Sequence, residues 1–425
     1  MKTMKKLIAL VVSLVMLLAF AGCGSKNETT KKDSGKKSSS DFKIGVILVG
    51  DENEGYTYAH IEGIKKAAKE LNISDDQIIW KYSIAEDESC YDAAAEMADQ
   101  GCKAVFSNSY GHQSYMVQAA EEFPDVTFIA ITGDTAAVCG QDNVCNAFTK
   151  IYESRYVSGV VAGMKVASLQ AEGKLSAQNF DKDGKIKIGY VGAYPYAEVV
   201  SGYTAFFLGI RSVIENVAME VTYTNSWFDI TAEGEAANRL MADGCVIIGQ
   251  HADSTGAPAA VQAALEKGTV AYSIGYNVDM LETAPQAALT SATNNWSVYY
   301  NYAFKCLLED KKIATNWSKG FDGDAVAITK LGESCAEGTQ EKVDEVEAKI
   351  RSGELHVFDI NTFTVGGAKV ESHKFDFSTM NEDFSAVLYK GPTEEVIKDG
   401  YFDESDFRSA PYFDLRIDGI TELSN

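Results

Sequence analysis

An internal repeat is the feature that most constrains how this chain can fold. The segment KIGVILVG, which begins at Lys43, resembles KIGYVGAY, which begins at Lys187, 144 positions later. The segments EMADQGCKAVFSNS and LMADGCVIIGQHADS also match, and their cysteines, Cys102 and Cys245, are 143 positions apart. Two matches at almost the same offset predict two copies of one structural unit, which neither match would predict alone.

Each copy alternates short apolar runs with amphipathic segments. In the first copy we expect strands at 44–49, 78–82, 104–107 and 127–130 and helices at 57–71, 89–100 and 111–122. In the second copy we expect strands at 188–191, 220–224, 246–249 and 270–274 and helices at 198–214, 232–243 and 257–267. Short apolar strands are typical of parallel sheets covered on both faces. The predicted fold class is α/β, with two doubly wound parallel-sheet lobes and a ligand cleft between them.

The first 40 residues predict export and anchoring. Basic residues precede an apolar run at 7–21, which is shorter than the ~20 residues that a bilayer requires. The run ends in FAGC, which resembles the lipobox of bacterial lipoprotein signal peptides and predicts a signal peptide at 1–22 and lipidation of Cys23. An ordinary secretory signal with an incidental cysteine is the alternative. Residues 24–40 have no aliphatic or aromatic side chain, so we expect 23–40 to be a disordered tether on the extracytoplasmic face of the cell membrane.

Charge and cysteine content narrow the possible partners. The formal net charge of −23 disfavours nucleic acid, whose phosphates require clustered lysine and arginine. The chain has no CxxC motif and five scattered histidines, so we predict no metal site and no cofactor. If Cys23 carries lipid, an odd number of cysteines remains. Cys139 and Cys145 are close enough in sequence to bridge a loop, whereas Cys102 and Cys245 begin buried strands and are expected in the core.

The residues that follow each predicted strand are the candidate ligand contacts. Many are aromatic or carry uncharged hydrogen-bonding groups, which suits a flat, neutral, polar ligand. Rings would stack on the faces of such a ligand and amides would meet its edge. Any one of these aromatic residues could equally belong to the core. The candidates on these loops are Tyr56, Thr57, Asn108, Ser109, Tyr110, Trp227, Phe228, Gln250, His251 and Asn277.

Nine segments resemble the basic membrane protein (BMP) family of substrate-binding lipoproteins, which serve ABC importers. The resemblance is strongest to the branch with a GWTYAH-type loop, and it runs in order from about residue 43 to 358, whereas the last ~60 residues match poorly. The matching segments are GYTYAHIEG (55–63), FSNSYG (106–111), EEFPDVTF (121–128), YESRYVSGVVAG (152–163), IGYVGAYPYAEVVSGYTAFFLG (188–209), NSWFD (225–229), GQHADS (249–254), SIGYNVDM (273–280) and LTSATNNW (289–296).

The resemblance implies a type I periplasmic-binding-protein fold, in which two lobes close on a small molecule and present a surface to permease subunits. We expect lobe 1 to comprise 41–150 plus about 276–325, and lobe 2 to comprise 151–275 plus about 326–365. A C-terminal extension at 366–425 would pack on the lobes or extend them.

The resemblance also implies roles for four residues, because characterised members of the family include purine nucleoside receptors. Tyr56 stands where the family has a Phe or Trp that stacks on the base, and Trp227 where a second aromatic residue stacks from the other lobe. Asn277 stands where nucleoside receptors usually have an Asp that holds the ribose hydroxyls, and Asn294 near a position that in some members is Lys. An Asn offers one acceptor and one donor group, so these two changes put ribose recognition in doubt and open the site to a free base.

Three classes of function follow. The first is an importer's binding protein for a purine nucleoside or free purine base. The second is a binding protein for a sugar or another small polar ligand, or a ligand sensor. The third is a nucleoside-acting enzyme, for which the acids Asp51, Glu52 and Glu54 are the only candidates. No nucleophile motif or metal set accompanies them, and such acids more often lie in solvent or complement a helix N-terminus, so we predict no catalysis.

Overall fold

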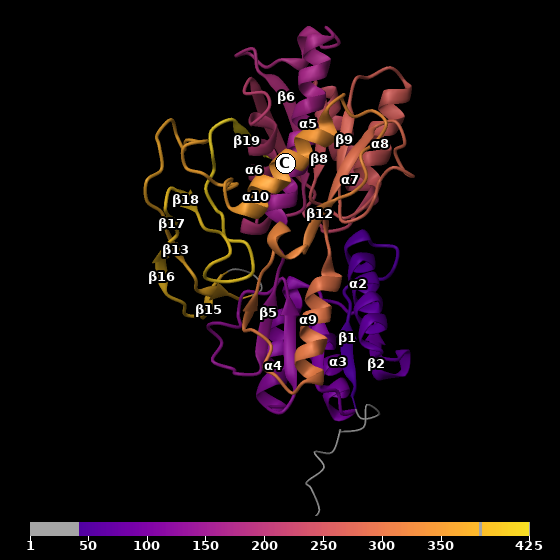
Figure 1. The fold of residues 1–425 in the computed structure, drawn as a ribbon, viewed down its shortest axis with the longest axis vertical. Coiled ribbons are helices and arrows are strands. Elements are labelled where there is room, and N and C mark those ends of the chain that lie inside the picture. The colour runs from indigo at the N-terminus through magenta and orange to yellow at the C-terminus, as the bar shows by residue number, and fades with distance from the viewer. Residues whose placement is uncertain (1–41, 382–384, 425) are drawn as a thin grey trace, which may run out of the picture. The chain divides into compact units, whose positions relative to one another are not determined.

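The computed structural model describes residues 42–381 and 385–424, and Figure 1 shows two parallel sheets flanked by helices. The predicted signal peptide, Cys23 and tether lie outside these residues. Among the described residues, no helix combines the length and the apolarity that a membrane span needs. The predicted α/β fold class with two parallel sheets is confirmed.

The sheet of lobe 1 has six strands in the order β11-β5-β4-β3-β1-β2, all parallel. The strands are β1 (Ile44–Ile47), β2 (Ile78–Lys81), β3 (Ala104–Ser107), β4 (Thr127–Ile131), β5 (Val144–Ala147) and β11 (Asn316–Trp317). The helices of this lobe are α2 (Gly55–Leu71), α3 (Glu88–Asp99), α4 (Gln113–Glu122) and α9 (Trp296–Leu308). Strands β1, β3 and β5 are buried at every residue, which explains why apolar residues predominate in them.

The sheet of lobe 2 has seven strands in the order β12-β10-β9-β8-β6-β7-β19, and only the β10–β12 pair is antiparallel among them. The strands are β6 (Ile186–Gly192), β7 (Val217–Tyr223), β8 (Ile247–Gln250), β9 (Tyr272–Tyr276), β10 (Ala288–Asn294), β12 (Val326–Ile328) and β19 (Ile420–Glu422). The helices are α5 (Ile151–Ala171), α6 (Ala197–Arg211), α7 (Ile230–Ala242), α8 (Gly256–Glu266) and α10 (Thr339–Ser352).

The internal repeat is confirmed by strand pairing. In lobe 1, Ile44 of β1 pairs with Ala104 of β3, and in lobe 2, Ile188 of β6 pairs with Ile247 of β8. The order β5-β4-β3-β1-β2 in one sheet is the order β10-β9-β8-β6-β7 in the other. The offsets that the sequence shows therefore relate equivalent strands.

The boundary expected near residue 276 is wrong. Strand β10 pairs with β9, so the chain stays in lobe 2 until about Asn294 and returns to lobe 1 only with helix α9. The run Ala288–Asn294 is buried at all but one residue, but it contains three hydroxyl side chains and lacks the apolar continuity that marked the other strands. The error follows from that composition.

The C-terminal extension packs mainly on lobe 2. Phe413 stacks on Phe358 with ring centroids 4.3 Å apart, and β19 adds a parallel strand to the edge of β7. The buried Glu404 accepts hydrogen bonds from the Ser201 hydroxyl (2.6 Å) and from a backbone N–H in the extension. The small strands of the extension are β13 (Lys374–Asp376), β14 (Thr379–Met380), β15 (Val387–Tyr389), β16 (Thr393–Glu395), β17 (Ile397–Lys398) and β18 (Tyr401–Phe402).

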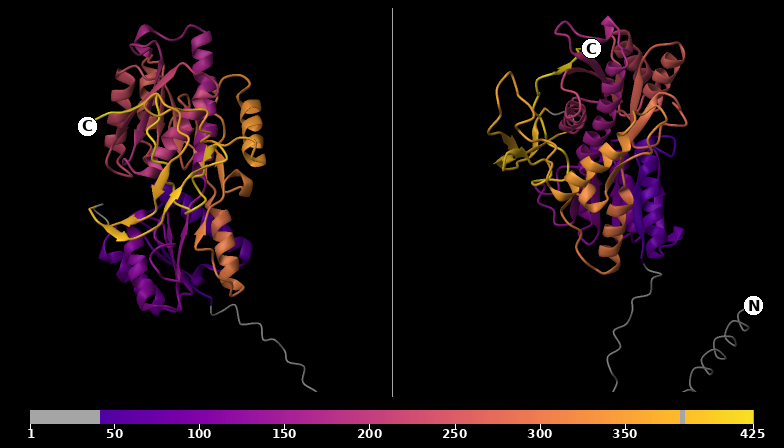
Figure 2. Two further views of the ribbon diagram at one scale, coloured as in Figure 1. Left: turned by 90° about the vertical axis from the view of Figure 1, so that its left-hand side faces the viewer. Right: turned by 45° about the horizontal axis from the view of Figure 1, so that its top comes forward.

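The extension also contacts lobe 1. Arg408 forms an ion pair with Asp134, with 3.0 Å between Nη1 and Oδ2, and the Ser409 N–H donates to the Asn316 side chain over 3.3 Å. Figure 2 shows the extension, drawn in yellow, running along one side of both lobes. This segment therefore joins the two lobes without belonging to either copy of the repeat.

The cysteines in the described part of the chain are all free thiols. Cys139 and Cys145 do not form the bridge that their spacing allowed, because the Cys145 thiol faces the Ile313 carbonyl at 3.8 Å inside lobe 1. Cys102 and Cys245 are buried, as predicted.

Candidate functional site

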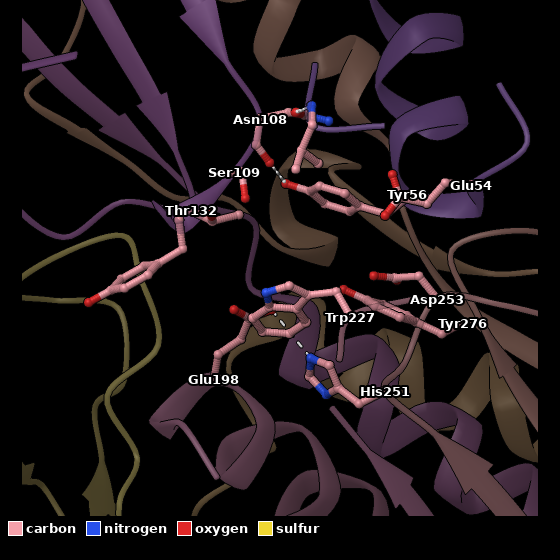
Figure 3. A pocket seen from close by; sticks show the side chains of 12 residues that line it. Glu54, Tyr56, Asn108, Ser109, Thr132, Glu198, Trp227, His251, Asp253 and Tyr276 are labelled. Atoms are coloured by element: carbon pink, nitrogen blue, oxygen red, sulfur yellow. Dashed lines mark hydrogen bonds and ion pairs between the residues drawn. The ribbon is translucent and has the colours of Figure 1, made fainter. Parts of the chain in front are cut away.

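The candidate site is a cavity of about 60 Å³ at the carboxyl ends of strands from both sheets (Figure 3). This is where parallel α/β sheets bind ligands. Among the described residues, no lysine or arginine lines it. The cavity, hereafter the inner cavity, is lined by Val49, Glu54, Tyr56, Asn108, Ser109, Tyr110, Thr132, Glu198, Trp227, His251, Asp253 and Tyr276.

Tyr56 supplies an aromatic wall from lobe 1. It lies in the first turn of α2, and its hydroxyl donates a 2.6 Å hydrogen bond to the carbonyl of Asn108, which follows β3. The buried His60, one turn further along α2, packs edge-on against the Tyr56 ring with centroids 4.6 Å apart. Both contacts fix the ring, so its position does not depend on a ligand.

Asn108 and Thr57 are hydrogen-bonded to each other on the lobe 1 side of the inner cavity. The Asn108 side chain accepts from the Val49 N–H (2.9 Å) and donates to the Thr57 hydroxyl (3.2 Å), which in turn donates to the Glu54 carboxylate. Both side chains are buried. Asn108 therefore lines the inner cavity with its amide already bonded, and Thr57 lies one layer behind it.

Trp227 supplies the aromatic wall from lobe 2, across from Tyr56 in Figure 3. Its carbonyl accepts from the Asp253 N–H at 2.8 Å, which ties together the loops after β7 and β8. The rings of Tyr194 and Tyr196 pack edge-on against the indole, with centroids 5.2 and 6.1 Å away. The indole thus has neighbours on lobe 2 and keeps one side toward the inner cavity.

Three carboxyl groups line the inner cavity, and burial raises the pKa of each. Burial raises the pKa of Glu198 to about 7, against the opposing effect of Arg155. The pKa of Asp253 lies well above its usual range because it is buried and near Glu54, Glu233 and Glu198. Burial also raises the pKa of Glu54. These groups keep their protons to higher pH than solvated acids and can donate as well as accept hydrogen bonds.

His251 lines the lobe 2 side of the inner cavity as a neutral imidazole. Burial and the nearby Arg155 hold its pKa well below its usual range. Its Nε2 lies 3.3 Å from Glu198 Oε1, and its Nδ1 lies 3.5 Å from the Tyr190 hydroxyl. Arg155 sits beneath, over the Tyr276 ring at 3.7 Å, so lobe 2 places a buried cation behind its acids.

Asn277 and Asn294 do not line the inner cavity. Asn277 donates to Asp253 Oδ1 over 2.7 Å, and its own side-chain oxygen accepts from Asn294 over 3.1 Å. The Thr149 hydroxyl donates to Asn294 and completes the chain of bonds. The two asparagines therefore orient Asp253, which carries the carboxyl group facing the inner cavity.

The remaining predicted residues divide into two groups. Ser109, Tyr110 and His251 line the inner cavity. Gln250 does not, because its amide donates to the carbonyls of Ala252 and Ser254, and Phe228 is 37% exposed outside it.

The sequence did not single out six lining residues, although the candidate loops after predicted strands contain all of them except Val49: Val49, Glu54, Thr132, Glu198, Asp253 and Tyr276. Each lies at or directly after a predicted strand or at the start of a helix, so strand-end position was an available signal. Glu54 was set aside together with Asp51 and Glu52 because acidic loop residues are usually solvated, whereas Glu198 and Asp253 were not considered individually.

Two loops of the cleft have unusual backbone conformations. Thr132, which follows β4 and lines the inner cavity, has φ of 69°, and Asn277, which follows β9, has φ of 62°. Left-handed backbone is disfavoured for a β-branched residue and costs of order 1–3 kcal/mol, so it persists where the surroundings impose it, often at ligand sites.

Comparison with known proteins agrees with this geometry. Residues 42–361 match the family model described as ABC transporter substrate-binding protein PnrA-like. The chain belongs to this family. It is therefore a substrate-binding protein and not an enzyme. Members of this family bind small molecules outside the cytoplasm for ABC transporters.

Two relatives and one solved structure show which proteins this chain is similar to. A purine-binding protein of Brucella abortus is 32% identical over 75% of this chain and 83% of its own length. A protein of Haloferax volcanii named for ABC transporter glucose binding is 29% identical over 82% of this chain and 80% of its own. An ABC transporter solute-binding protein of Aeropyrum pernix shares the fold with a TM-score of 0.62 at 18% identity, over 75% of this chain and 93% of its own.

Proposed function

We propose that this protein captures a free purine base for an ABC importer by stacking it between Tyr56 and Trp227. The observation that carries this proposal is the placement of two aromatic rings, one from each lobe, in the same inner cavity. Stacking of a base on an aromatic ring contributes about 1–3 kcal/mol for each ring. The purine-binding relative supports the same ligand class.

The polar lining suits the edge of a purine. Purines present N–H donors and ring-nitrogen acceptors side by side. The acids Glu54, Glu198 and Asp253, with raised pKa values, offer acceptor oxygens and, when protonated, a donor. Neutral His251 adds a ring nitrogen on the same side.

A free base fits this site better than a nucleoside. The inner cavity of about 60 Å³ would hold roughly four to six water molecules. Asn277 and Asn294, at the positions that the family resemblance links to ribose, bond to each other and to Asp253 instead. A ribose would have to extend beyond Tyr110 into the larger cavities outside.

Thermal unfolding with a ligand panel tests the proposal. The panel is adenine, guanine, hypoxanthine, adenosine, guanosine and glucose, each at several concentrations. A base present at 100 times its Kd should add about 2.7 kcal/mol of apparent stability. Calorimetry then gives Kd, and a base binding more tightly than its nucleoside is the expected result. No shift with any purine overturns the proposal.

Glucose is in the panel because the Haloferax relative is named for glucose binding. Aromatic rings and carboxylates are also found together in sugar sites. A stability gain with glucose and none with purines would replace the purine with a sugar.

We infer also that the protein is a lipoprotein anchored through Cys23 and that it delivers its ligand to permease subunits. The FAGC sequence and the tether composition support this. Labelling of the expressed protein with a fatty-acid analogue should be lost in C23S, and the variant should leave the membrane fraction. Equal labelling of both forms would contradict the anchor.

A further inference from the structure

The C-terminal extension encloses space outside the inner cavity. Two outer cavities, of about 570 and 440 Å³, are each lined by lobe 1, by lobe 2 and by residues of the extension such as Met380. Tyr110 lines the inner cavity and both outer cavities, and Tyr196 lines both outer cavities. Trp227 is shared by the inner cavity and one outer cavity, and Thr132 and Glu198 by the inner cavity and the other, but among these lining residues Tyr110 alone borders all three cavities.

Tyr110 meets Tyr196 across the cleft. Tyr110 comes from the short helix after β3 in lobe 1, and Tyr196 directly precedes α6 in lobe 2. Their ring centroids are 6.3 Å apart at an interplanar angle of 38°. The two rings therefore form a contact between the lobes at the boundary of the inner cavity.

Tyr110 is held by a relay that begins in the extension. Its hydroxyl donates to Asp134 Oδ2 over 3.4 Å, and the same oxygen accepts from Arg408 Nη1 over 3.0 Å. Asp134 and Arg408 are 8% and 9% exposed, so solvent screens the ion pair weakly. Burial and the neighbouring Asp134 raise the pKa of Tyr110, so the phenol stays a donor at physiological pH.

Both ends of the relay are fixed. The Asp134 N–H donates to the Gln113 side chain over 2.8 Å. The Arg408 guanidinium donates to the carbonyls of Ala410 (3.3 Å) and Pro411 (3.4 Å), and it lies over the ring of Phe375 at 5.3 Å. Contacts within the extension thus hold the Arg408 guanidinium in place, and Arg408 in turn pairs with Asp134 on a loop of lobe 1.

We propose that Arg408 is a positioning residue that acts through Asp134 to hold Tyr110 as a gate between the inner and outer cavities. The extension then sets how fast ligand enters and leaves, whereas the inner cavity sets affinity. This inference rests on the proposed function in one respect, which is that the inner cavity holds the ligand.

Stopped-flow fluorescence with whichever of adenine, guanine and hypoxanthine binds most tightly in the thermal-unfolding panel tests the gate. R408Q breaks the ion pair from the extension side, D134N weakens it from lobe 1, and Y110F removes only the hydroxyl. In each variant we expect both the association and the dissociation rate constants to rise, by about tenfold in R408Q. In R408Q and D134N, whose side chains do not line the inner cavity, Kd should stay within threefold. The double variant R408Q/Y110F should be no faster than R408Q, because the two groups act in one relay.

R416Q is the matched control. Arg416 is also an arginine of the extension paired with a carboxylate, Glu422, but it lies away from Asp134. Its rate constants should stay within twofold of wild type. Unchanged rate constants in R408Q, D134N and Y110F overturn the gate, as does a rise in dissociation alone, or a double variant whose effects multiply.

Hydrogen exchange of the ligand-free protein separates this inference from the proposed function. Peptides covering 109–122 should exchange faster in R408Q and D134N than in wild type, and unchanged exchange would refute the positioning role. If wild type binds no purine, the proposed function fails, and exchange still decides whether Arg408 positions Tyr110. Y110F also excludes local unfolding of the extension as the cause, because it leaves the Arg408–Asp134 ion pair in place.

Discussion

The two lobes share a strand order but differ in how closely their helices approach. In each lobe the first helix packs on the helix that carries the chain in from the other lobe, α2 on α9 and α6 on α5. In lobe 1 only Gly63 marks this contact, and a Cβ there would lie 2.9 Å from the Trp296 Cβ. In lobe 2, Gly159 and Gly209 face each other, and a Cβ on either would collide with a backbone carbonyl of the other helix. Both helix pairs are therefore in close contact, but the approach of backbone to backbone is tighter in lobe 2 than in lobe 1.

The lobes differ also in the walls that they give to the inner cavity. Lobe 1 contributes Tyr56, Ser109 and groups whose hydrogen bonds are made within the lobe, such as the Asn108 amide. Lobe 2 contributes Trp227 together with two acids, Glu198 and Asp253, a neutral histidine and a buried arginine behind them. Lobe 1 therefore supplies one lining acid, Glu54, and otherwise groups bonded within the lobe, whereas lobe 2 supplies most of the ionisable groups of the inner cavity.

G159A should give the largest effect and would sharpen the contrast between the helix pairs. The added methyl meets the Phe206 carbonyl, a backbone atom that cannot rotate away, so the helices must separate. We expect a loss of about 3 kcal/mol in the free energy of unfolding, measured by urea denaturation. G63A meets side-chain and backbone atoms of α9 at 2.9–3.1 Å and should lose about 1–2 kcal/mol. Equal losses would mean that the two contacts are equivalent.

W227A and Y56A compare the two aromatic walls. Each removes one stacking face and should weaken binding of the purine base by about 1–3 kcal/mol, roughly 5- to 150-fold in Kd. Calorimetry measures both. Y56F keeps the ring and loses only the bond to the Asn108 carbonyl, so it should cost about 1 kcal/mol or less. Y82A, on the exposed Tyr82 of lobe 1, is the control and should leave Kd unchanged. Unaltered affinity in W227A would remove lobe 2 from the stacking model.

These predictions depend on features that the sequence predicted to different degrees. The repeat and the strand ends were predictable, because buried parallel strands need continuous apolar runs. Strand β10 was not, because the run Ala288–Asn294 is rich in hydroxyl groups, and its partner β9 supplies the context that makes it a strand. The extension has no counterpart in the repeat, so nothing in the pattern indicated its contacts with Asp134 and Asn316.

Within the site, the sequence predicted positions better than roles. Tyr56, Trp227 and His251 line the inner cavity, and their strand-end positions were the signal. Asn277 stands at a position where the resemblance implies an acid. In the structure Asn277 donates a hydrogen bond to Asp253, an acid from a different loop that lines the inner cavity. Such an exchange between loops depends on three-dimensional contact, and a single sequence does not reveal it.

E198Q should have a smaller effect than G159A, and it tests whether lobe 2 makes the protein sensitive to pH. Glu198 has a folded pKa of about 7, above its ordinary value of 4.5, because it is buried. The unfolded chain therefore releases this proton first, and the folded state loses stability as pH rises from about 4.5 to about 7. The amide cannot ionise, so E198Q should gain about 1–2 kcal/mol over wild type at pH 8 and little at pH 4.5. Urea denaturation across this range measures the difference, with E62Q on the exposed Glu62–Lys65 pair of lobe 1 as the control, where a change below about 0.5 kcal/mol is expected. If the difference in unfolding free energy between E198Q and wild type does not change with pH, the ionisation of Glu198 beside Arg155 costs the folded state nothing. Lobe 2 would then differ from lobe 1 in its residues but not in its response to pH.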